Sequence, residues 1–352
     1  MGALANHTTL RLGGPAGALL THTDPTAWPD LAHAIHRESV RPHLLGGGSN
    51  ILAADAGLAG LVILMATRGI TAHLTAGGDV EVTAQAGEPL SALVDYTVAE
   101  GLSGIEYLGG IPGTTGAAPI QNSGAYGQQI SDVLTQITAY DWQSHTTTRL
   151  LPAACAFGYR TSVFKTQPWR WTILTVTLRL RLSAIAAPVA YRHLAEELGV
   201  PLGTRPSLAE AAEGVLANRR ARGLLLPKTG PDSRQAGSVF LNPPVSAHQA
   251  AAIHAAGGPV MRDLHGVQRA SAGWLLEQAG YRPGCRLAAG VYCSTHRTLT
   301  LTARERATAS GFAAALRTLA TEVHTATGIR LRPEPVMLGF DSQPVHSSAD
   351  WA

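Results

Sequence analysis

One short segment of the chain sets an arginine among aromatic and hydroxyl side chains. Arg160 follows Tyr159 within the run Phe157–Lys165, which reads FGYRTSVFK. A guanidinium in such a setting can bind a carboxylate or a phosphate through paired hydrogen bonds, and it binds best where water is partly excluded. The alternative is an ordinary arginine on a surface strand, whose ion pairs would contribute little.

Two further segments place a reactive side chain beside residues that restrict the backbone. Ser238 follows small residues in the run Ala236–Pro244, which leaves its hydroxyl accessible for donating a proton. The run lacks the G-x-S-x-G spacing of serine hydrolases, so a hydrolase nucleophile is disfavoured. Glu334 lies between Pro333 and Pro335, which limit the directions its carboxylate can take. The alternatives are a turn serine and an exposed loop glutamate.

Two glycine-rich segments could hold a phosphorylated ligand. Gly109–Gly127 reads GGIPGTTGAAPIQNSGAYG and contains six glycines, two prolines and no charged side chain. Such a segment makes a poor helix, but it can form successive turns whose amide N–H groups face an anion. Gly46–Asn50 offers a second such cluster, and neither segment has Rossmann or P-loop spacing. The pair predicts a cofactor with two phosphates, and the alternative is that both are turns between strands.

Length and charge narrow the class of protein. The 352 residues exceed one core of ordinary size, so about two or three domains are expected. The net charge is only +3, and no basic stripe is interleaved with aromatic residues, so nucleic acid is not an expected partner. Arg219, Arg220 and Arg222 are interpreted as the solvated face of a helix. The longest apolar run, Ala56–Ala66, is far shorter than the roughly 20 residues of a membrane span, and no N-terminal signal pattern is present, so no membrane insertion is expected.

The cysteines disfavour both a disulfide framework and a metal site. Cys155, Cys285 and Cys293 are odd in number and form no C-x-x-C pair. Cys293 and His296 have ligand-like spacing, but no second pair completes a zinc site. This usage indicates a reducing compartment, so a cytoplasmic protein without a metal is predicted. A monomer is also expected.

Hydrophobic patterns predict alternating short strands and helices in the first half of the chain, and a mainly helical second half that is broken by short strands. Thr71–Thr75 and Val80–Ala84 flank a glycine turn and are interpreted as a β-hairpin, and Ser207 with Glu210 predicts a capping box. The other expected strands are His43–Leu45, Leu61–Met65, Val133–Asp141, Trp171–Leu182, Arg286–Tyr292 and Thr298–Thr302, after a strand-and-turn entry at Ala3–Ala16. The expected helices are Pro29–Ser39, Pro89–Glu100, Tyr191–Leu198, Ser207–Arg222, Ser246–Ala256, Ser271–Ala279 and Ala303–Thr327.

Taken in chain order, these segments resemble the UDP-N-acetylenolpyruvoylglucosamine reductase (MurB) family of peptidoglycan synthesis. The resemblance runs from Asn6–Gly14, which reads NHTTLRLGG, to Glu334–Gly339, and so covers nearly the whole chain. Several motifs in the same order are far more specific than any one of them. Tyr191, in Pro188–Tyr191, resembles the mobile tyrosine of the longer form of the family.

The resemblance implies an α+β fold with a flavin domain of the vanillyl-alcohol-oxidase (PCMH) type, built from two α/β subdomains, and a C-terminal α+β substrate-binding domain. The implied boundaries are 1–183 for the FAD-binding domain (subdomains 1–67 and 68–183, with 328–340 returning near the site), 184–205 for a connecting tyrosine-loop segment, 206–327 for the substrate-binding domain and 341–352 for a disordered tail. The implied catalytic residues are Arg160, Ser238 and Glu334, and the implied substrate-binding residues are Tyr159, Tyr191, Arg222, Asn242 and Gln278. The implied residues for non-covalent FAD are Gly46, Gly47, Gly48, Ser49, Asn50, Ile51, Gly110, Ile111, Pro112, Gly113, Thr114, Thr115, Gly116, Ala117, Gln121, Asn122, Gly124, Ala125, Tyr126 and Gly127.

The implied activity is reduction of an enolpyruvyl sugar nucleotide, with NADPH as the hydride donor and FAD as the carrier. Arg160 and Glu334 would hold and polarise the substrate carboxylate, and Ser238 would donate the proton. The chain departs from the family where Arg222 replaces a common lysine, where Leu241 precedes Asn242, and where Val239 replaces a common phenylalanine.

Three other functions remain open at this stage. A paralogue acting on a different nucleotide sugar would explain Arg222 and Leu241. A non-catalytic flavin or nucleotide-sugar binder is disfavoured because the three implied catalytic residues are intact. A covalent-flavin oxidase is disfavoured because neither glycine segment contains a histidine or cysteine for the linkage.

Overall fold

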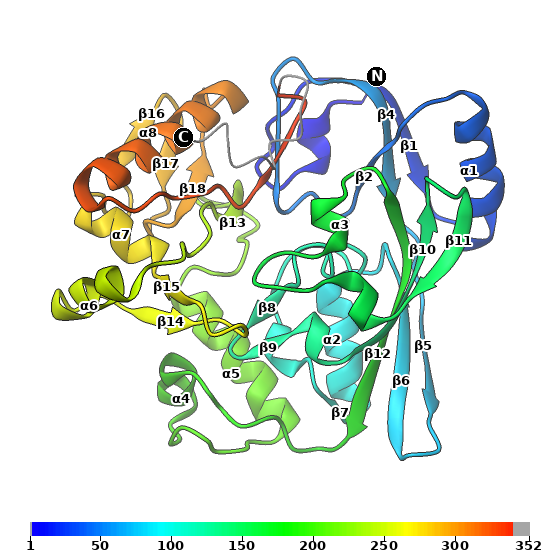
Figure 1. Cartoon of the computed structure of the whole chain (residues 1–352), viewed down its shortest axis with the longest axis horizontal. Helices are drawn as coiled ribbons and strands as arrows, with labels where there is room; N and C mark the ends of the chain where they lie inside the picture. Colours follow the sequence, from blue (N-terminus) through cyan, green and yellow to red (C-terminus); the bar gives the residue numbers. More distant parts are fainter. Residues whose placement is uncertain (1, 341–352) are drawn as a thin grey trace. The chain divides into compact units, whose positions relative to one another are not determined.

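The computed structural model describes residues 2–340, and the predicted disordered tail at 341–352 lies outside them. The chain divides into two compact units. The central unit comprises Ala18–Gly47 and Gly60–Leu225, and the terminal unit comprises the described parts of Met1–Gly17, Gly48–Ala59 and Leu226–Ala352 (Figure 1). Of the predicted catalytic residues, Arg160 belongs to the central unit, and Ser238 and Glu334 belong to the terminal unit. The units are described in turn.

A six-stranded antiparallel sheet forms the centre of the central unit. Its strands run in the order β11–β10–β12–β6–β5, and β7 pairs with the end of β12. Along β6, Val80, Val82 and Ala84 are buried and alternate with half-buried residues, as expected for a strand with one face in the core. The strands are β5 Ile70–Leu74, β6 Asp79–Gln85, β7 Leu102–Ser103, β10 Leu134–Asp141, β11 Thr146–Leu150 and β12 Trp171–Leu182. The predicted hairpin is confirmed as β5–β6, with Gly78 at a φ of +86° in its turn.

A smaller sheet and two helices complete the core of this unit. In the order β1–β4–β2, the strands are β1 Ala16–His22, β4 Leu58–Met65 and β2 His43–Leu45, with β2 and β4 parallel. The first residues of β1 and β4 belong to the terminal unit. Helices α1 (Trp28–Arg37) and α2 (Leu90–Ala99) bury Trp28, Leu90 and Leu93 in the same hydrophobic core as the large sheet. Short elements complete the unit: η2 Pro25–Ala27, η3 Glu106–Leu108, β8 Gly124–Ala125, β9 Gln128–Gln129, η4 Ile130–Asp132, η5 Pro152–Cys155 and α3 Val163–Thr166.

Helices α4 (Arg192–Leu198) and α5 (Leu208–Ala221) also belong to the central unit, whereas the predicted division places α5 in the substrate-binding domain. A second core joins them to Tyr107 and Val189. The carboxylate of Glu106 accepts the amide N–H of Ala187 at 2.7 Å, and Tyr107 Oη donates to the Ala187 carbonyl at 2.6 Å. These contacts attach the segment before α4 to this unit, which local sequence patterns do not reveal.

The terminal unit packs helices against a four-stranded antiparallel sheet. Its strand order is β13–β18–β17–β16, with β13 Gln235–Ser238, β16 Arg286–Ala288, β17 Val291–Cys293 and β18 Thr300–Ala303. Phe312 and Leu316 of α8 (Ala309–Thr327) and Leu275 of α7 (Ala272–Gln278) are fully buried in its core. The remaining elements are η1 Leu4–His7, β3 Ile51–Ala53, α6 Ala247–Ala255, β14 Val260–Arg262, β15 Gln268–Ala270 and β19 Val336–Leu338, which pairs in parallel with β3.

Helix ends follow local chemistry where the sequence supplies it. The predicted capping box at Ser207 is confirmed, because its hydroxyl accepts the Glu210 amide at 3.2 Å while the Glu210 carboxylate accepts the Ser207 amide at 2.9 Å. The predicted helix Ala303–Thr327 is wrong at its start, because Ala303 ends β18 and the helix begins at Ala309. Thr308 caps it by accepting the Gly311 amide at 3.0 Å.

Two other expected elements differ from the structure. The predicted strand Arg286–Tyr292 is two strands separated by a turn at Gly290, whose φ of +70° breaks the extended run. The predicted entry at Ala3–Ala16 contains the short helix η1, and its strand begins only at Ala16.

Candidate active site

The two glycine segments of the central unit lie directly against each other. A Cβ at Gly46 would lie 2.4 Å from Thr114 Oγ1, and one at Gly47 would lie 2.9 Å from Gly113 Cα. Any side chain at these positions would force the two segments apart. Residues 109–127 form turns and a two-residue strand without a helix, as the sequence predicts.

Two buried hydroxyl groups in this contact have no hydrogen-bond partner among the described residues. Thr115 is completely buried and Thr114 is 8% exposed, yet neither Oγ1 atom is satisfied. An unsatisfied buried hydroxyl typically costs about 1–3 kcal/mol, and a ligand at this contact could supply the missing partners. Together with the glycine-lined contact, they fit the diphosphate of FAD.

The amide groups of the two segments are only partly available for an anion. The amides of Thr115 and Gly116 donate to the carbonyls of Glu88 and Ala86, at 2.7 and 2.9 Å. The amides of Gly47, Gly48 and Ser49 make no backbone hydrogen bond to the described residues. The shorter segment is therefore the better candidate for a phosphate-binding nest.

Gly48 continues this segment in the terminal unit, where it packs on the N-terminal residues. Its φ is +61°, and a Cβ would lie 1.9 Å from the His7 carbonyl oxygen. The Gly48 carbonyl accepts the Thr9 amide at 3.1 Å. Only glycine fits this position, because both the conformation and the space exclude a side chain.

Arg160 is held against the longer glycine segment within the central unit. Its Nη1 donates to the Asn122 carbonyl at 3.1 Å and its Nη2 donates to the Gly124 carbonyl at 2.7 Å. The backbone of Arg160 has a φ of +53°, a left-handed conformation that is uncommon outside glycine and clusters at functional sites. Its guanidinium also lies 5.7 Å from the centre of the Tyr159 ring. These contacts exclude the interpretation of Arg160 as a simple surface-strand arginine.

Tyr126 and Tyr191 meet beside the end of the same glycine segment. Tyr126 is buried, and its Oη donates to Asn218 Oδ1 at 3.0 Å. The rings of Tyr126 and Tyr191 meet edge to face with centres 6.0 Å apart, and Tyr191 is 41% exposed. Gly127 lies next to the Tyr191 ring, where a Cβ would make ordinary contact at 3.6 Å. Tyr191 thus joins a core contact while keeping its own ring accessible.

Arg219 is buried, which corrects the interpretation of its cluster as a solvated face. It is only 8% exposed, whereas Arg220 and Arg222 are exposed as expected. Burial lowers the pKa of Arg219, and nearby Tyr126 partly opposes that shift. Its Nε has no partner among the described residues, and a Cβ at Gly110 would lie 3.1 Å from it. A buried guanidinium with a free donor beside the glycine segment is a functional candidate.

The sequence contains a signal for Arg219 that was missed. Ala211, Val215 and Arg219 recur every four residues along α5, so all three lie on its buried stripe.

Ser238 and Glu334 come together in the terminal unit, although 96 positions separate them in the sequence. The amide of Glu334 donates to the carbonyl of Val239, the residue after Ser238, at 2.9 Å. Asn50 Nδ2 donates to the Glu334 carbonyl at 3.2 Å, which brings the shorter glycine segment to the same place. Gly237 has a φ of +72° at an irregularity in the β13–β18 pairing, and such bulges re-aim the side chain that follows.

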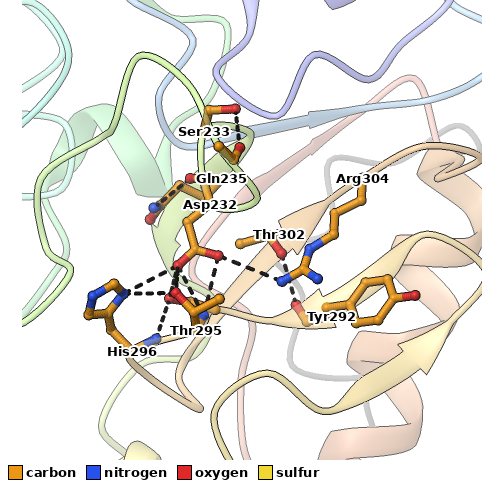
Figure 2. A network of polar contacts seen from close by, with 10 residues as sticks. Asp232, Ser233, Gln235, Tyr292, Thr295, His296, Thr302 and Arg304 are labelled. Atoms are coloured by element: carbon orange, nitrogen blue, oxygen red, sulfur yellow. Dashed lines mark hydrogen bonds and ion pairs between the residues drawn. The ribbon is translucent and has the colours of Figure 1, made fainter.

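A buried carboxylate network anchors the segment that leads into β13 (Figure 2). Asp232 is 6% exposed and accepts hydrogen bonds from Ser294 Oγ and Thr295 Oγ1, each at 2.7 Å. His296 Nδ1 lies 3.5 Å from Asp232 Oδ2, and Arg304 Nη2 lies 3.8 Å from Asp232 Oδ1. Burial by itself would raise the pKa of Asp232, but the hydrogen bonds outweigh burial and hold that pKa below its usual value. Sequence analysis missed this residue because its partners are distant in the chain.

The remaining predicted substrate residues have less distinctive surroundings. Asn242 Oδ1 accepts the Ala272 amide at 3.0 Å and thereby caps the start of α7, so this oxygen is already used by the fold. Gln278 is exposed at the end of α7. Within residues 2–340, no helix is long and apolar enough to cross a membrane, and no three His, Cys, Asp or Glu side chains are grouped to hold a metal.

Known protein families match segments of both units. Residues 18–148 match the FAD binding domain family, and residues 230–338 match the family described as UDP-N-acetylenolpyruvoylglucosamine reductase, C-terminal domain. The chain is 38% identical over 345 residues to the UDP-N-acetylenolpyruvoylglucosamine reductase of Salinispora arenicola, covering 95% of this chain and 94% of that protein. This chain belongs to the UDP-N-acetylenolpyruvoylglucosamine reductase (MurB) family. The reductase of Streptomyces avermitilis is 39% identical over 348 residues, covering 96% and 94% of the two chains.

A solved MurB structure shows the same fold. The crystal structure of the Thermus caldophilus enzyme matches with a TM-score of 0.62 at 23% identity, covering 96% of this chain and 97% of that one. The predicted α+β MurB fold with its FAD-binding domain is therefore confirmed. The individual site residues stay predictions, and the domain boundaries are untested by these matches.

Proposed function

We propose that this chain catalyses the FAD-dependent reduction of UDP-N-acetylenolpyruvoylglucosamine to UDP-N-acetylmuramate, with NADPH as the hydride donor. The MurB family membership supports this activity. The observation that carries it is the pair of hydrogen bonds that join Glu334 to Val239, the residue after Ser238, and to the Asn50 side chain. Reduction of an unsaturated acid beside a flavin requires a proton donor and groups that orient the acid and the cofactor. Ser238, Glu334 and the shorter glycine segment would fill these roles.

FAD, when bound, supplies hydride transfer between NADPH and the enolpyruvyl double bond. Gly46 and Gly47, with the hydroxyls of Thr114 and Thr115, would hold its diphosphate. Arg219 would supply a positive charge near the cofactor, since its buried guanidinium keeps a free Nε donor.

The chain's own side chains then control charge and protons. Arg160 holds the carbonyls of Asn122 and Gly124 through two N–H groups, and the same guanidinium would bind the substrate carboxylate. Negative charge develops on the carbon next to that carboxylate, where Arg160 and Glu334 would stabilise and orient it. Ser238 would donate the proton that completes reduction and would regain one from solvent afterwards.

Tyr191 would close over the uridine nucleotide, since its ring is accessible beside Gly127, and Arg222 would contact the diphosphate from the end of α5. Tyr159, Asn242 and Gln278 stay predicted substrate contacts. The monomeric state and the cytoplasmic location also stay predictions.

The test is NADPH consumption by the purified flavoprotein with two matched sugar nucleotides. We expect rapid consumption with UDP-N-acetylenolpyruvoylglucosamine and none above background with UDP-N-acetylglucosamine, which lacks the enolpyruvyl group. Equal rates with both compounds, or no consumption with either, would contradict the proposal. An Arg160→Lys variant should lose more activity than stability, because lysine keeps the charge but not the paired geometry.

A further inference from the structure

Two cysteines of the terminal unit meet on one hairpin. Cys285 immediately precedes β16, and Cys293 ends β17. Their Sγ atoms lie 3.3 Å apart, and the Cys285 thiol donates to the Cys293 sulfur. The sequence has no C-x-x-C pair and disfavours a disulfide framework, so this pairing appears only when the turn at Gly290 is in place.

The backbone around the two thiols is already fixed in register. The Cys293 amide donates to the Cys285 carbonyl at 2.9 Å, and the Gly284 amide donates to the Ser294 carbonyl at 2.9 Å. Arg286 and Tyr292 pair directly in the adjoining β16–β17 ladder. Since a disulfide bond is about 2.0 Å long, the sulfur atoms need to approach by only roughly 1.3 Å. Rotation of the side chains can supply most of that movement.

The two thiols differ in access to solvent. Cys285 is half-buried, whereas Cys293 is completely buried. Burial, together with the thiol of Cys285, raises the pKa of Cys293 well above its usual range. A small oxidant therefore reaches Cys285 first, and Cys293 waits beside it as a protonated thiol.

We propose that Cys285 and Cys293 form a thiol modification site, which a peroxide converts into a reversible intramolecular disulfide. The Cys285 sulfur attacks hydrogen peroxide, so that an S–O bond forms, the O–O bond breaks, and the released hydroxide takes the thiol proton to form water. The Cys293 sulfur then attacks the sulfenic sulfur, an S–S bond forms, and the S–O oxygen leaves as a second water with the Cys293 proton. Two thiols are oxidised and one peroxide is reduced. Neither step uses the flavin.

The experiment counts thiols directly, so it does not depend on the proposed enzymatic activity. The full chain is exposed to hydrogen peroxide under native conditions, denatured without reductant, and labelled with a maleimide. The chain has three cysteines, so we expect three labels before oxidation and one afterwards, on Cys155, with a peptide pair linked through Cys285 and Cys293. A thiol reductant should restore all three labels. Retention of three labels at a peroxide dose that oxidises the urea-unfolded chain would overturn the proposal.

Two variants separate this pair from general oxidation. In Cys293→Ser, the sulfenic acid on Cys285 should persist and react with dimedone, because no resolving thiol is present. Cys155→Ser is the matched control, since Cys155 is fully buried and burial raises its pKa to about 11. This control should lose both of its labels on oxidation. A disulfide that involves Cys155, or one that joins two chains, would overturn the assignment.

Discussion

Thr115→Val tests whether the glycine contact of the central unit is built for a phosphate. The Thr115 hydroxyl is completely buried and unpaired among the described residues, and valine replaces only that hydroxyl with a methyl group. Without the cofactor, removing an unsatisfied hydroxyl should raise the free energy of unfolding by about 1–3 kcal/mol. With FAD, the variant should lose one hydrogen bond to a charged group, about 1.5–3 kcal/mol, or roughly 10- to 150-fold in affinity. Stability and affinity should therefore change in opposite directions.

The assay combines urea unfolding of the FAD-free protein with a titration of FAD by fluorescence quenching. Thr97→Val is the matched control, because Thr97 is equally buried but its hydroxyl donates to the Val94 carbonyl at 2.9 Å. This control should lose about 1 kcal/mol of stability and keep the affinity of the natural protein for FAD. An unchanged FAD affinity in Thr115→Val, or a loss of stability equal to that of the control, would refute the reasoning.

Three further substitutions probe other parts of the site. Ser238→Ala should leave reduction of the flavin by NADPH near normal, but it should slow reoxidation of the flavin by substrate about 100- to 10,000-fold. Both half-reactions are measured by stopped-flow absorbance, and equal slowing of both would exclude Ser238 as the proton donor. Gly47→Ala should weaken FAD binding about 5-fold or more, because the added Cβ would lie 2.9 Å from Gly113 Cα and force the two glycine segments apart. An unchanged FAD content after purification would show that FAD binding does not depend on this close contact. Asp232→Asn should remove a pH-dependent part of stability. Because the folded-state pKa of Asp232 is lowered, its contribution is present above the unfolded pKa of about 3.9 and is lost as the pH falls below it. Stability would be measured by urea unfolding between about pH 6 and about pH 3, a range that brackets this pKa. The free energy of unfolding of the variant should fall less over this range than that of the natural protein. An equal fall would contradict the role of Asp232 in stability.

Patterns among neighbouring residues predict much of the fold. The capping box at Ser207, the hairpin of β5 and β6, and the absence of a helix in residues 109–127 all follow from neighbouring residues, and the structure agrees with each. The start of α8 shows where local reasoning stops. Ala303 fits a helical pattern, but it is taken into β18 by pairing with Val291. Sheet pairing between distant segments decided that boundary.

The candidate site is predictable to a similar extent. Ser238, Glu334 and Arg160 stand out because restrictive neighbours surround each one in the sequence. Asp232 and Arg219 do not, since their significance comes from burial and from partners that are close only after folding. Contacts between residues that are distant in the chain give little signal in the sequence. For Arg219 the signal is the periodic pattern of the buried stripe of α5.

The most direct measurement is a single turnover of the reduced flavin in the absence of oxygen. The protein is reduced with one equivalent of NADPH and then mixed with UDP-N-acetylenolpyruvoylglucosamine while the flavin absorbance is recorded. Complete recovery of the oxidised spectrum, with one UDP-N-acetylmuramate formed per flavin, is the predicted result. A flavin that stays reduced until oxygen is admitted would contradict the assignment of this chain as a reductase of that substrate.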